Sequence, residues 1–158
     1  MIRSIFVAAV AALLLVVTPA FADNGNIHLG DLDISMPFAR ATLPNAPVAG
    51  GFMTITNHGA AADTLLSVTS SVAATAQVHE MKMDGDVMKM RALPDGLEIP
   101  AGGAVTLSPG GYHIMFMGLK QPFVEGTKVT ITLTFKAAGA VDIDLPVLGA
   151  AAAAAMAH

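Results

Sequence analysis

The sequence predicts an all-β domain, an antiparallel β-sandwich or barrel of about nine short strands. Three observations predict it. Short segments rich in Val, Ile, Thr and Phe alternate between apolar and polar residues, as half-buried strands do. Gly, Pro and Asp-Gly turn signals separate these segments. No convincing amphipathic helix follows the N-terminal apolar stretch. We therefore expect one sheet-built core, for which the chain of 158 residues is long enough.

Nine segments carry the strand pattern. In chain order they are LDISM (32–36), GFMTITN (51–57), TLLSVTS (64–70), AQVHEMKM (76–83), VMKMRAL (87–93), AVTLS (104–108), YHIMFMG (112–118), KVTITLTFK (128–136) and VDIDLPV (141–147). The clearest is 128–136, where Val129, Ile131, Leu133 and Phe135 share one face. That face is predicted to be buried.

The ends of the chain differ from this domain. Arg3, an apolar run from Ile5 to Val17 and the sequence Ala20-Phe21-Ala22 together predict a secretory signal peptide over residues 1–22, cut before Asp23. The apolar run is shorter than the ~20 residues that a spanning helix needs. The alternative, an uncleaved anchor, is disfavoured because the A-x-A sequence favours cleavage. We expect export to a periplasm, a domain over 23–148, and a disordered low-complexity tail over 149–158.

Composition excludes several functions. The formal net charge is −4, and without a basic patch a nucleic-acid partner is not expected. The chain has no cysteine. This excludes thiolate catalysis and any metal site with a cysteine ligand, including the His₂Cys type of blue copper proteins. After removal of the signal peptide, stable membrane insertion is not expected either.

The stretch VHEMKMDGDVMKM, residues 78–90, is predicted to be a hairpin rich in methionine. If Asp84-Gly85 forms its two-residue loop, His79 faces Met90 and Met81 faces Met88. If the loop is Gly85-Asp86, His79 faces Ala92 and Met81 faces Met90. We prefer the first register, because it also pairs Glu80 with Lys89 across the strands. In both registers His79, Met81, Met88 and Met90 share one face.

A second strand shows the same composition. His113, Met115 and Met117 alternate in GGYHIMFMG, so they share one face, and Tyr112, Ile114 and Phe116 take the opposite, core-facing side.

Thioether sulfur is a soft, neutral donor that favours Cu(I), and imidazole also suits copper. Zinc would be expected to use Cys or carboxylate beside His. Calcium and magnesium need oxygen ligands. The two strands therefore predict a copper site.

The spacing His79-x10-Met90 … His113-x-Met115 resembles the signature of the periplasmic PCu(A)C copper chaperones. Between Met90 and His113 lie 22 residues, one more than is usual in that family. The resemblance covers about residues 27–147, and Phe38 stands where the family often has tryptophan. It implies a cupredoxin-like fold and one Cu(I) ion per chain held by His79, Met90, His113 and Met115. It also implies delivery of copper to the CuA centre of cytochrome c oxidase, often alongside a thioredoxin-like Sco protein.

Other residues have weaker predicted roles. Met81, Met88 and Met117 are candidate auxiliary contacts, chosen because they share the predicted face and not because of the signature. Met156 and His158 could form a weak second copper site in the tail. His28 and His58 have no soft neighbours in the sequence and are expected to be ordinary surface residues.

Three other functions compete with copper delivery. A copper enzyme usually needs more histidines or an amino-terminal histidine, whereas the expected mature terminus is Asp23, so we expect no enzymatic activity. A copper storage or resistance protein would use the same ligands, and the sequence leaves that alternative open. An adhesive β-sandwich would leave the two matched His/Met strands unexplained.

Overall fold

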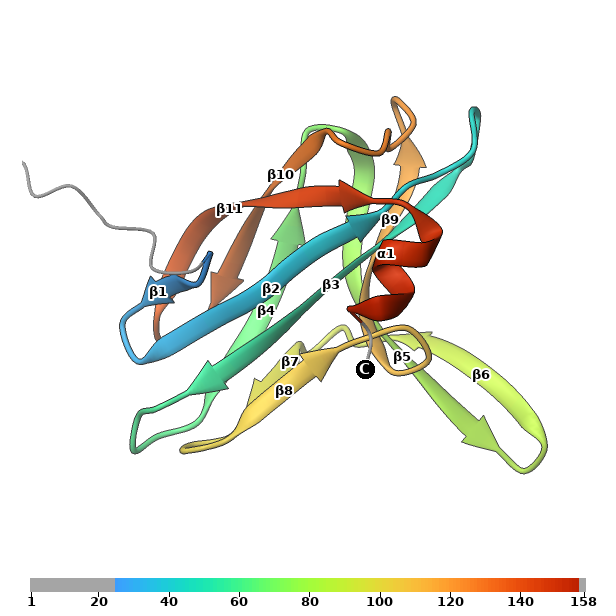
Figure 1. Cartoon of the computed structure of the whole chain (residues 1–158). Coiled ribbons are helices and arrows are strands. Elements are labelled where there is room, and N and C mark those ends of the chain that lie inside the picture. The colour runs from blue at the N-terminus through green and yellow to red at the C-terminus, as the bar shows by residue number, and fades with distance from the viewer. Residues whose placement is uncertain (1–24, 157–158) are drawn as a thin grey trace, which may run out of the picture.

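The computed structural model describes residues 25–156, and within them eleven strands and one short helix are found (Figure 1). In chain order the elements are β1 (Ile27–Leu29), β2 (Leu32–Arg40), β3 (Val48–Asn57), β4 (Asp63–Thr69), β5 (Ala73–Asp84), β6 (Val87–Ala92), β7 (Leu97–Ile99), β8 (Ala104–Leu107), β9 (Tyr112–Leu119), β10 (Lys128–Phe135), β11 (Gly139–Leu148) and α1 (Ala150–Ala155). The predicted all-β class is confirmed.

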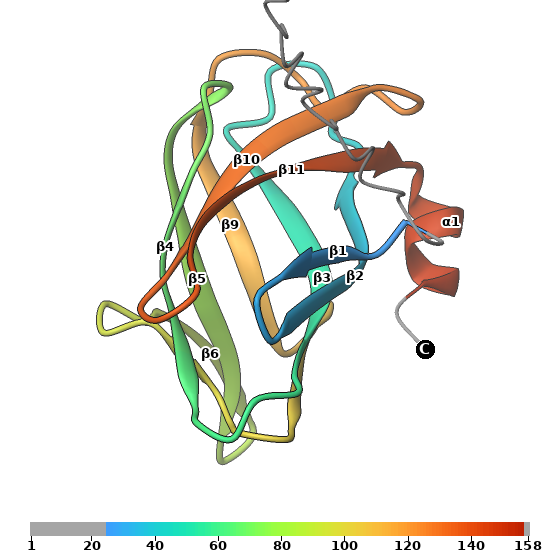
Figure 2. The same cartoon turned by 90° about the vertical axis from the view of Figure 1, so that its left-hand side faces the viewer.

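Seven strands close into a barrel in the order β5, β9, β3, β2, β11, β10, β4 and back to β5. The closing contact is short, with Val68 of β4 paired to Ala76 of β5. Within this ring the pairings are antiparallel except that of β11 with β2. Figure 2 shows the strands surrounding a common interior. The remaining strands extend the barrel wall: β1 pairs with β2, β6 with β5, β7 with β4, and β8 with β3 and β9.

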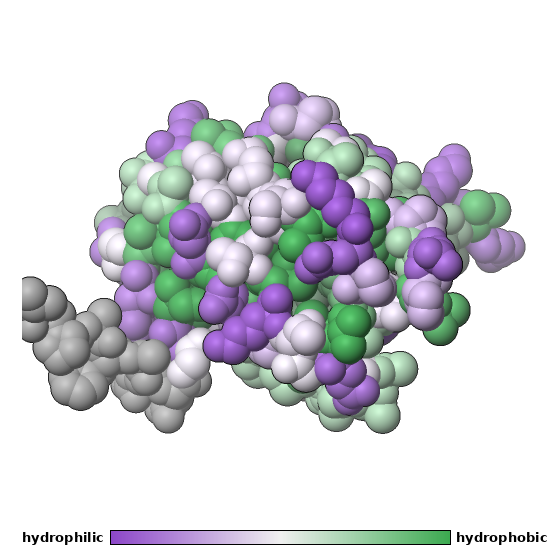
Figure 3. Space-filling view, turned by 90° about the horizontal axis from the view of Figure 1, so that it is seen from above, coloured by the Kyte–Doolittle hydropathy of each residue, from purple (hydrophilic) through white to green (hydrophobic). Residues whose placement is uncertain are grey.

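The interior of the barrel is the hydrophobic core, and period-two alternation along each strand fills it. On β10, Val129, Ile131, Leu133 and Phe135 are all buried, as predicted. On β9, Ile114 and Phe116 point inward and are fully buried. Outward-facing positions carry polar residues; for example, Thr132 on β10 donates to Asp142 of β11 over 2.6 Å. Polar and apolar residues are interspersed on the upper face of the molecule (Figure 3).

Each of the nine predicted segments overlaps a strand. The sequence did not reveal β1 and β7, which are three residues long each. Three residues are too few for a period-two pattern to stand out, and these strands exist because a neighbouring strand supplies their hydrogen bonds.

The prediction of a disordered tail was wrong for Ala150–Ala155, which form α1. Alanine has the highest intrinsic helix propensity, and the helix also has a packing partner. Ala153 is fully buried against Phe38 and Phe52, whose rings lie 5.1 Å apart on the outside of the barrel.

The predicted signal peptide (1–22) and His158 lie outside the described residues. Among residues 25–156, no helix has the length and apolar character needed to cross a membrane.

Candidate metal centre

The centre of the candidate site is a pair of histidines on neighbouring strands. His79 of β5 and His113 of β9 are direct cross-strand partners. Their ring centroids lie 5.9 Å apart, with an angle of 41° between the ring planes. His113 is buried, with 7% of its surface exposed, and His79 is partly buried. Strand pairing therefore brings together two residues that are 34 positions apart in the sequence.

The hydrogen bonds of the two rings leave one nitrogen of each without a protein partner. Nδ1 of His113 donates to the backbone oxygen of Gly111 over 3.2 Å, so its Nε2 carries the free lone pair. In His79, Nε2 donates to Oε1 of Gln77 over 3.3 Å. Nδ1 of His79 is buried and makes no hydrogen bond. A metal-ligating histidine characteristically donates its other ring N–H to an oxygen acceptor, and both rings fit that arrangement.

The environment favours the neutral form of His79. Burial lowers the pKa of His79 below its usual 6.5, and the electrostatic interaction with His113 lowers it further. Burial has this direction because it penalises the charged imidazolium. Only neutral imidazole can bind a metal, so the site keeps this nitrogen available.

The hairpin adopts the second of the two predicted registers, and the preferred first register was wrong. His79 pairs with Ala92, and Met81 pairs with Met90. The loop consists of Gly85 and Asp86. Gly85 has φ 64°, whereas Asp86 has no positive φ, which is the pattern of a type II′ turn with glycine at its first position.

Two ion pairs form across the hairpin in this register, in which Lys82 and Lys89 are directly opposed. Glu80 lies directly opposite Arg91, and Oε2 of Glu80 accepts from Nη2 of Arg91 over 2.7 Å. Lys89, which was expected opposite Glu80, instead contacts Asp84. Glu80 therefore forms a cross-strand ion pair, as predicted, but with Arg91 in place of Lys89.

The predicted residues still share one face in the observed register, although each has a different cross-strand partner from the one expected. Strands β6, β5 and β9 lie side by side, so alternation places one continuous row of side chains on each face. The face that carries the histidine pair also carries six methionines: Met81, Met83, Met88, Met90, Met115 and Met117. All four signature residues, His79, Met90, His113 and Met115, lie on it.

Relative to the histidines, the two signature methionines lie on opposite sides. Met90 is on β6, opposite Met81, and is therefore diagonal to His79. Met115 is on β9, opposite Gln77, and is diagonal to His79 in the other direction. Met90 is half exposed, and Met115 is partly buried where it lines a surface groove with Arg40 and Val48.

Sequence reasoning missed two residues on this face. Met83 lies directly opposite Met88, and alternation from His79 and Met81 would have placed it there. Gln77 accepts the His79 hydrogen bond. Its position at i−2 from His79 was a signal, but an exposed glutamine is too common for its type alone to indicate a role. Met117 pairs with Thr75 and lies farther along β9 from the histidines.

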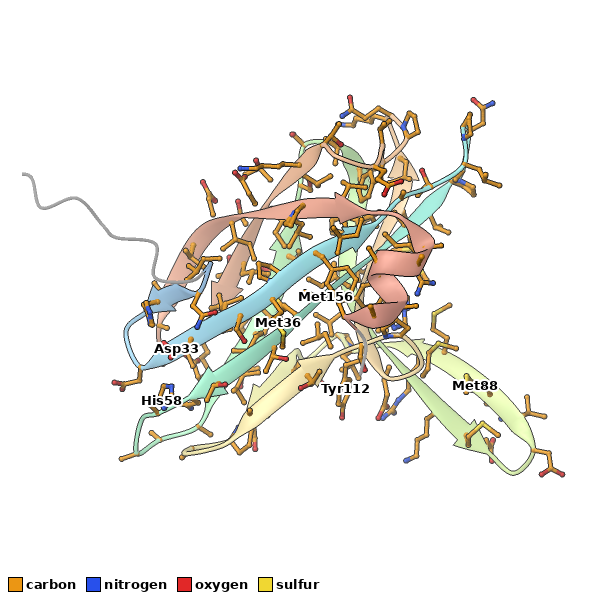
Figure 4. The ribbon with its side chains drawn as sticks, viewed as in Figure 1. Asp33, Met36, His58, Met88, Tyr112 and Met156 are labelled. Atoms are coloured by element: carbon orange, nitrogen blue, oxygen red, sulfur yellow. The ribbon has the colours of Figure 1, made fainter. Side chains whose placement is uncertain are left out.

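The tail residue Met156 is not part of this site. It lines a groove with Met36 and Phe38 beside α1, whereas the histidine pair lies on β5 and β9. Figure 4 shows Met36 and Met156 close together and Met88 apart from them on the hairpin. His28 and His58 are also separate, since both contact the carboxylate of Asp33.

Within residues 25–156, no group of three or more His, Cys, Asp or Glu side chains is arranged to hold a metal ion. The donors that the structure does bring together are two imidazole nitrogens and several thioether sulfurs. This donor set suits a soft ion such as Cu(I) better than zinc, calcium or magnesium. Fold and face together define a β-barrel protein whose surface carries a cluster of histidines and methionines, the candidate metal centre.

Comparison with known proteins agrees with this class. The model of the LpqE-like lipoprotein family matches residues 32–147. A protein of Leifsonia xyli subsp. xyli named as a lipoprotein, Lxx21020, is 32% identical over 144 residues, which cover 87% of this chain and 86% of the relative. The chain therefore belongs to the LpqE-like family, which is of PCuAC type.

Solved structures of PCuAC domains support the same assignment. The copper-bound PCuAC domain of PmoF2 is 27% identical, covers 78% of this chain and 97% of its own, and superposes with a TM-score of 0.67. Cu(I)-DR1885 of Deinococcus radiodurans, solved in solution, is 28% identical, covers 73% of this chain and 76% of its own, and has a TM-score of 0.60. The predicted family and its cupredoxin-like fold are confirmed, and the similarity to copper-bound domains supports copper binding.

Proposed function

We propose that this protein is a periplasmic Cu(I) metallochaperone that delivers copper for assembly of the CuA centre of cytochrome c oxidase. Its cargo is one Cu(I) ion per chain, bound by His79, Met90, His113 and Met115. The observation that carries the proposal is the direct pairing of His79 with His113, each with one ring nitrogen free of hydrogen bonds, on a face lined by methionines.

The donor set supports transfer by ligand exchange. Imidazole and thioether are neutral, so they hold Cu(I) without the charge attraction that a thiolate adds. Met90 is half exposed on β6, which forms an edge of the sheet. An acceptor can therefore approach Cu(I) from the Met90 side and replace one ligand at a time. A thiolate-bearing acceptor, such as the CuA subunit or a Sco-type protein, would then bind the ion more tightly.

No catalytic role is proposed. The solved neighbours include copper-bound and apo PCuAC domains, and the candidate residues here supply neutral metal ligands. Export through the predicted signal peptide would place the protein where the CuA centre is assembled.

The test of delivery is a transfer experiment. The protein loaded with one Cu(I) is mixed anaerobically with the apo, reduced CuA domain or with an apo Sco-type protein, and the copper content of each is measured after separation. Delivery predicts that copper moves to the acceptor faster from the loaded protein than from a small-molecule Cu(I) complex of equal affinity. Retention of copper by the donor would favour the alternative, a periplasmic storage or resistance protein with no dedicated delivery partner.

A further inference from the structure

The β5–β6 hairpin is an arm that extends beyond the barrel (Figure 1). Pairing of β5 with β9 ends at Glu80, which lies opposite Tyr112. Beyond that point only β6 supports β5, together with one hydrogen bond from the Met81 N–H to the oxygen of Gly111. All six residues of β6 are exposed. Neither face of the tip of the arm therefore packs against the hydrophobic core.

The two faces of the arm differ in chemistry. One face carries the charged residues Glu80, Lys82, Asp84, Lys89 and Arg91. The other carries four methionines in two adjacent cross-strand pairs, Met81 with Met90 and Met83 with Met88. Alternation separates the two sets completely.

These methionines are not core filler. The exposed fractions of Met83, Met88 and Met90 are 54%, 49% and 49%. A cluster of large apolar side chains left in solvent is the kind of surface that calls for a ligand or partner. Methionine commonly fills gaps in cores, and here there is no core to fill.

The spacing on the arm suits a shared ligand. Directly opposed residues of a sheet have Cβ atoms about 4.5–5.5 Å apart, and diagonal neighbours about 7–8 Å apart. The long, flexible methionine side chain can span such distances, so the sulfurs of Met83 and Met88 can reach one ion together with that of Met81. Thioether sulfurs alone select soft monovalent cations. Lysines and arginine lie on the opposite face, away from such an ion.

We propose that Met81, Met83 and Met88 form a second Cu(I) site, made of thioethers alone, on the arm next to the histidine site. Met90 lies between the two sites, opposite Met81 and diagonal to His79. An ion captured at the exposed arm can therefore pass to the histidine site through Met90. The second site is weaker than the first because it contains no imidazole. The passage of an ion to the histidine site rests on the proposed function, whereas the existence of the second site does not.

The test uses the full exported chain with ¹³C-labelled methionine methyl groups, titrated anaerobically with Cu(I) and followed by NMR. The first equivalent should shift the ring signals of His79 and His113. The second should shift the methyl signals of Met83 and Met88 while the ring signals stay constant. Saturation after one equivalent, with the Met83 and Met88 methyls unmoved, would overturn the second site. Failure of the first equivalent to move the ring signals would contradict the proposed function instead.

Matched variants locate the second ion. Met83→Leu/Met88→Leu keeps the arm apolar and should bind one equivalent in place of two. Met36→Leu/Met156→Leu removes the two thioethers beside α1 and should still bind two. Loss of the second ion from the α1 variant, with its retention in the arm variant, would place the site at the tail and overturn the proposal. Unchanged circular dichroism of both variants confirms that the comparison concerns binding and not folding.

Discussion

His79 and His113 are cross-strand partners, and their rings lie 5.9 Å apart at the junction of the barrel with the β5–β6 arm. The junction has two properties that the proposed copper carrier needs. One histidine is fixed in the barrel wall, where His113 is buried and donates to the Gly111 carbonyl. The other belongs to the strand that continues into the exposed methionine arm. The candidate site thus joins a buried histidine to an exposed arm.

Removal of the buried histidine tests its role as a ligand. His113→Ala should weaken Cu(I) binding by roughly 100-fold or more. Loss of a residue that only orients a ligand costs roughly 10–100-fold in affinity, and loss of the ligand itself should cost more. Competition against a chromogenic Cu(I) chelator measures this affinity. The matched control is His28→Ala, since His28 contacts Asp33 away from the site. Equal affinities of the two variants would remove His113 from the site.

The residue that orients His79 should also matter. Gln77→Leu removes the acceptor for Nε2 of His79 without removing a ligand. We expect a drop in Cu(I) affinity of about 10-fold. We also expect a change in the tautomer of His79, measurable from ¹⁵N shifts of its ring. Thr75→Val, on the same face but nearer Met117 than His79, is the control. An unchanged tautomer in Gln77→Leu would show that the hydrogen bond does not orient the ring.

The ionisation of Asp63 should make the folding stability of the protein depend on pH. Burial raises the pKa of this carboxyl, but the backbone N–H groups of Ala137, Thr64 and Ala138 donate to it, and the net result is a pKa below the usual 3.8. The carboxylate thereby ties the start of β4 to the β10–β11 turn. Because the pKa of Asp63 is lower in the folded state, its ionisation stabilises the fold fully at pH values above the unfolded-state pKa, near 3.8. This stabilisation is lost as the pH falls through the folded-state pKa.

Urea unfolding at pH 7 and at pH 3 measures that contribution. Asp63→Asn should lower the free energy of unfolding at pH 7 by roughly 1–3 kcal/mol, since hydrogen bonds to a charged group are replaced by weaker ones. The difference from the parent protein should shrink at low pH. Asp95→Asn provides a control at another aspartate. A difference that stays constant between the two pH values would contradict the assigned ionisation.

The strands and the histidine–methionine face could be predicted from sequence because both depend on period-two alternation. Phe135 and Ile131 fall inside and His113 and Met115 fall outside for the same reason. The hairpin register could not be decided this way. A shift of the loop by one residue preserves the face of every side chain in both strands and changes only the partners, so alternation gave the same face for Met81 and Met90 in either register.

Tertiary contacts decided the rest. The alanine tail forms a helix because Phe38 and Phe52, which are distant in sequence, supply the surface on which Ala153 packs. The hydrogen bond between His79 and Gln77 depended on side-chain rotamers, which no periodic pattern encodes. Closure of the barrel depended on the single pair Val68 and Ala76, which sequence alternation alone does not identify.

The most direct test of the copper site is an anaerobic Cu(I) competition titration of the chain from Asp23 onward, compared with Met90→Leu/Met115→Leu. Leucine keeps the volume and apolar character of methionine, so stability should change by less than about 1.5 kcal/mol per site. We expect a tight first equivalent in the parent protein and its loss in the variant. Equal, tight binding by both proteins would show that these thioethers are not ligands and would contradict the proposed site.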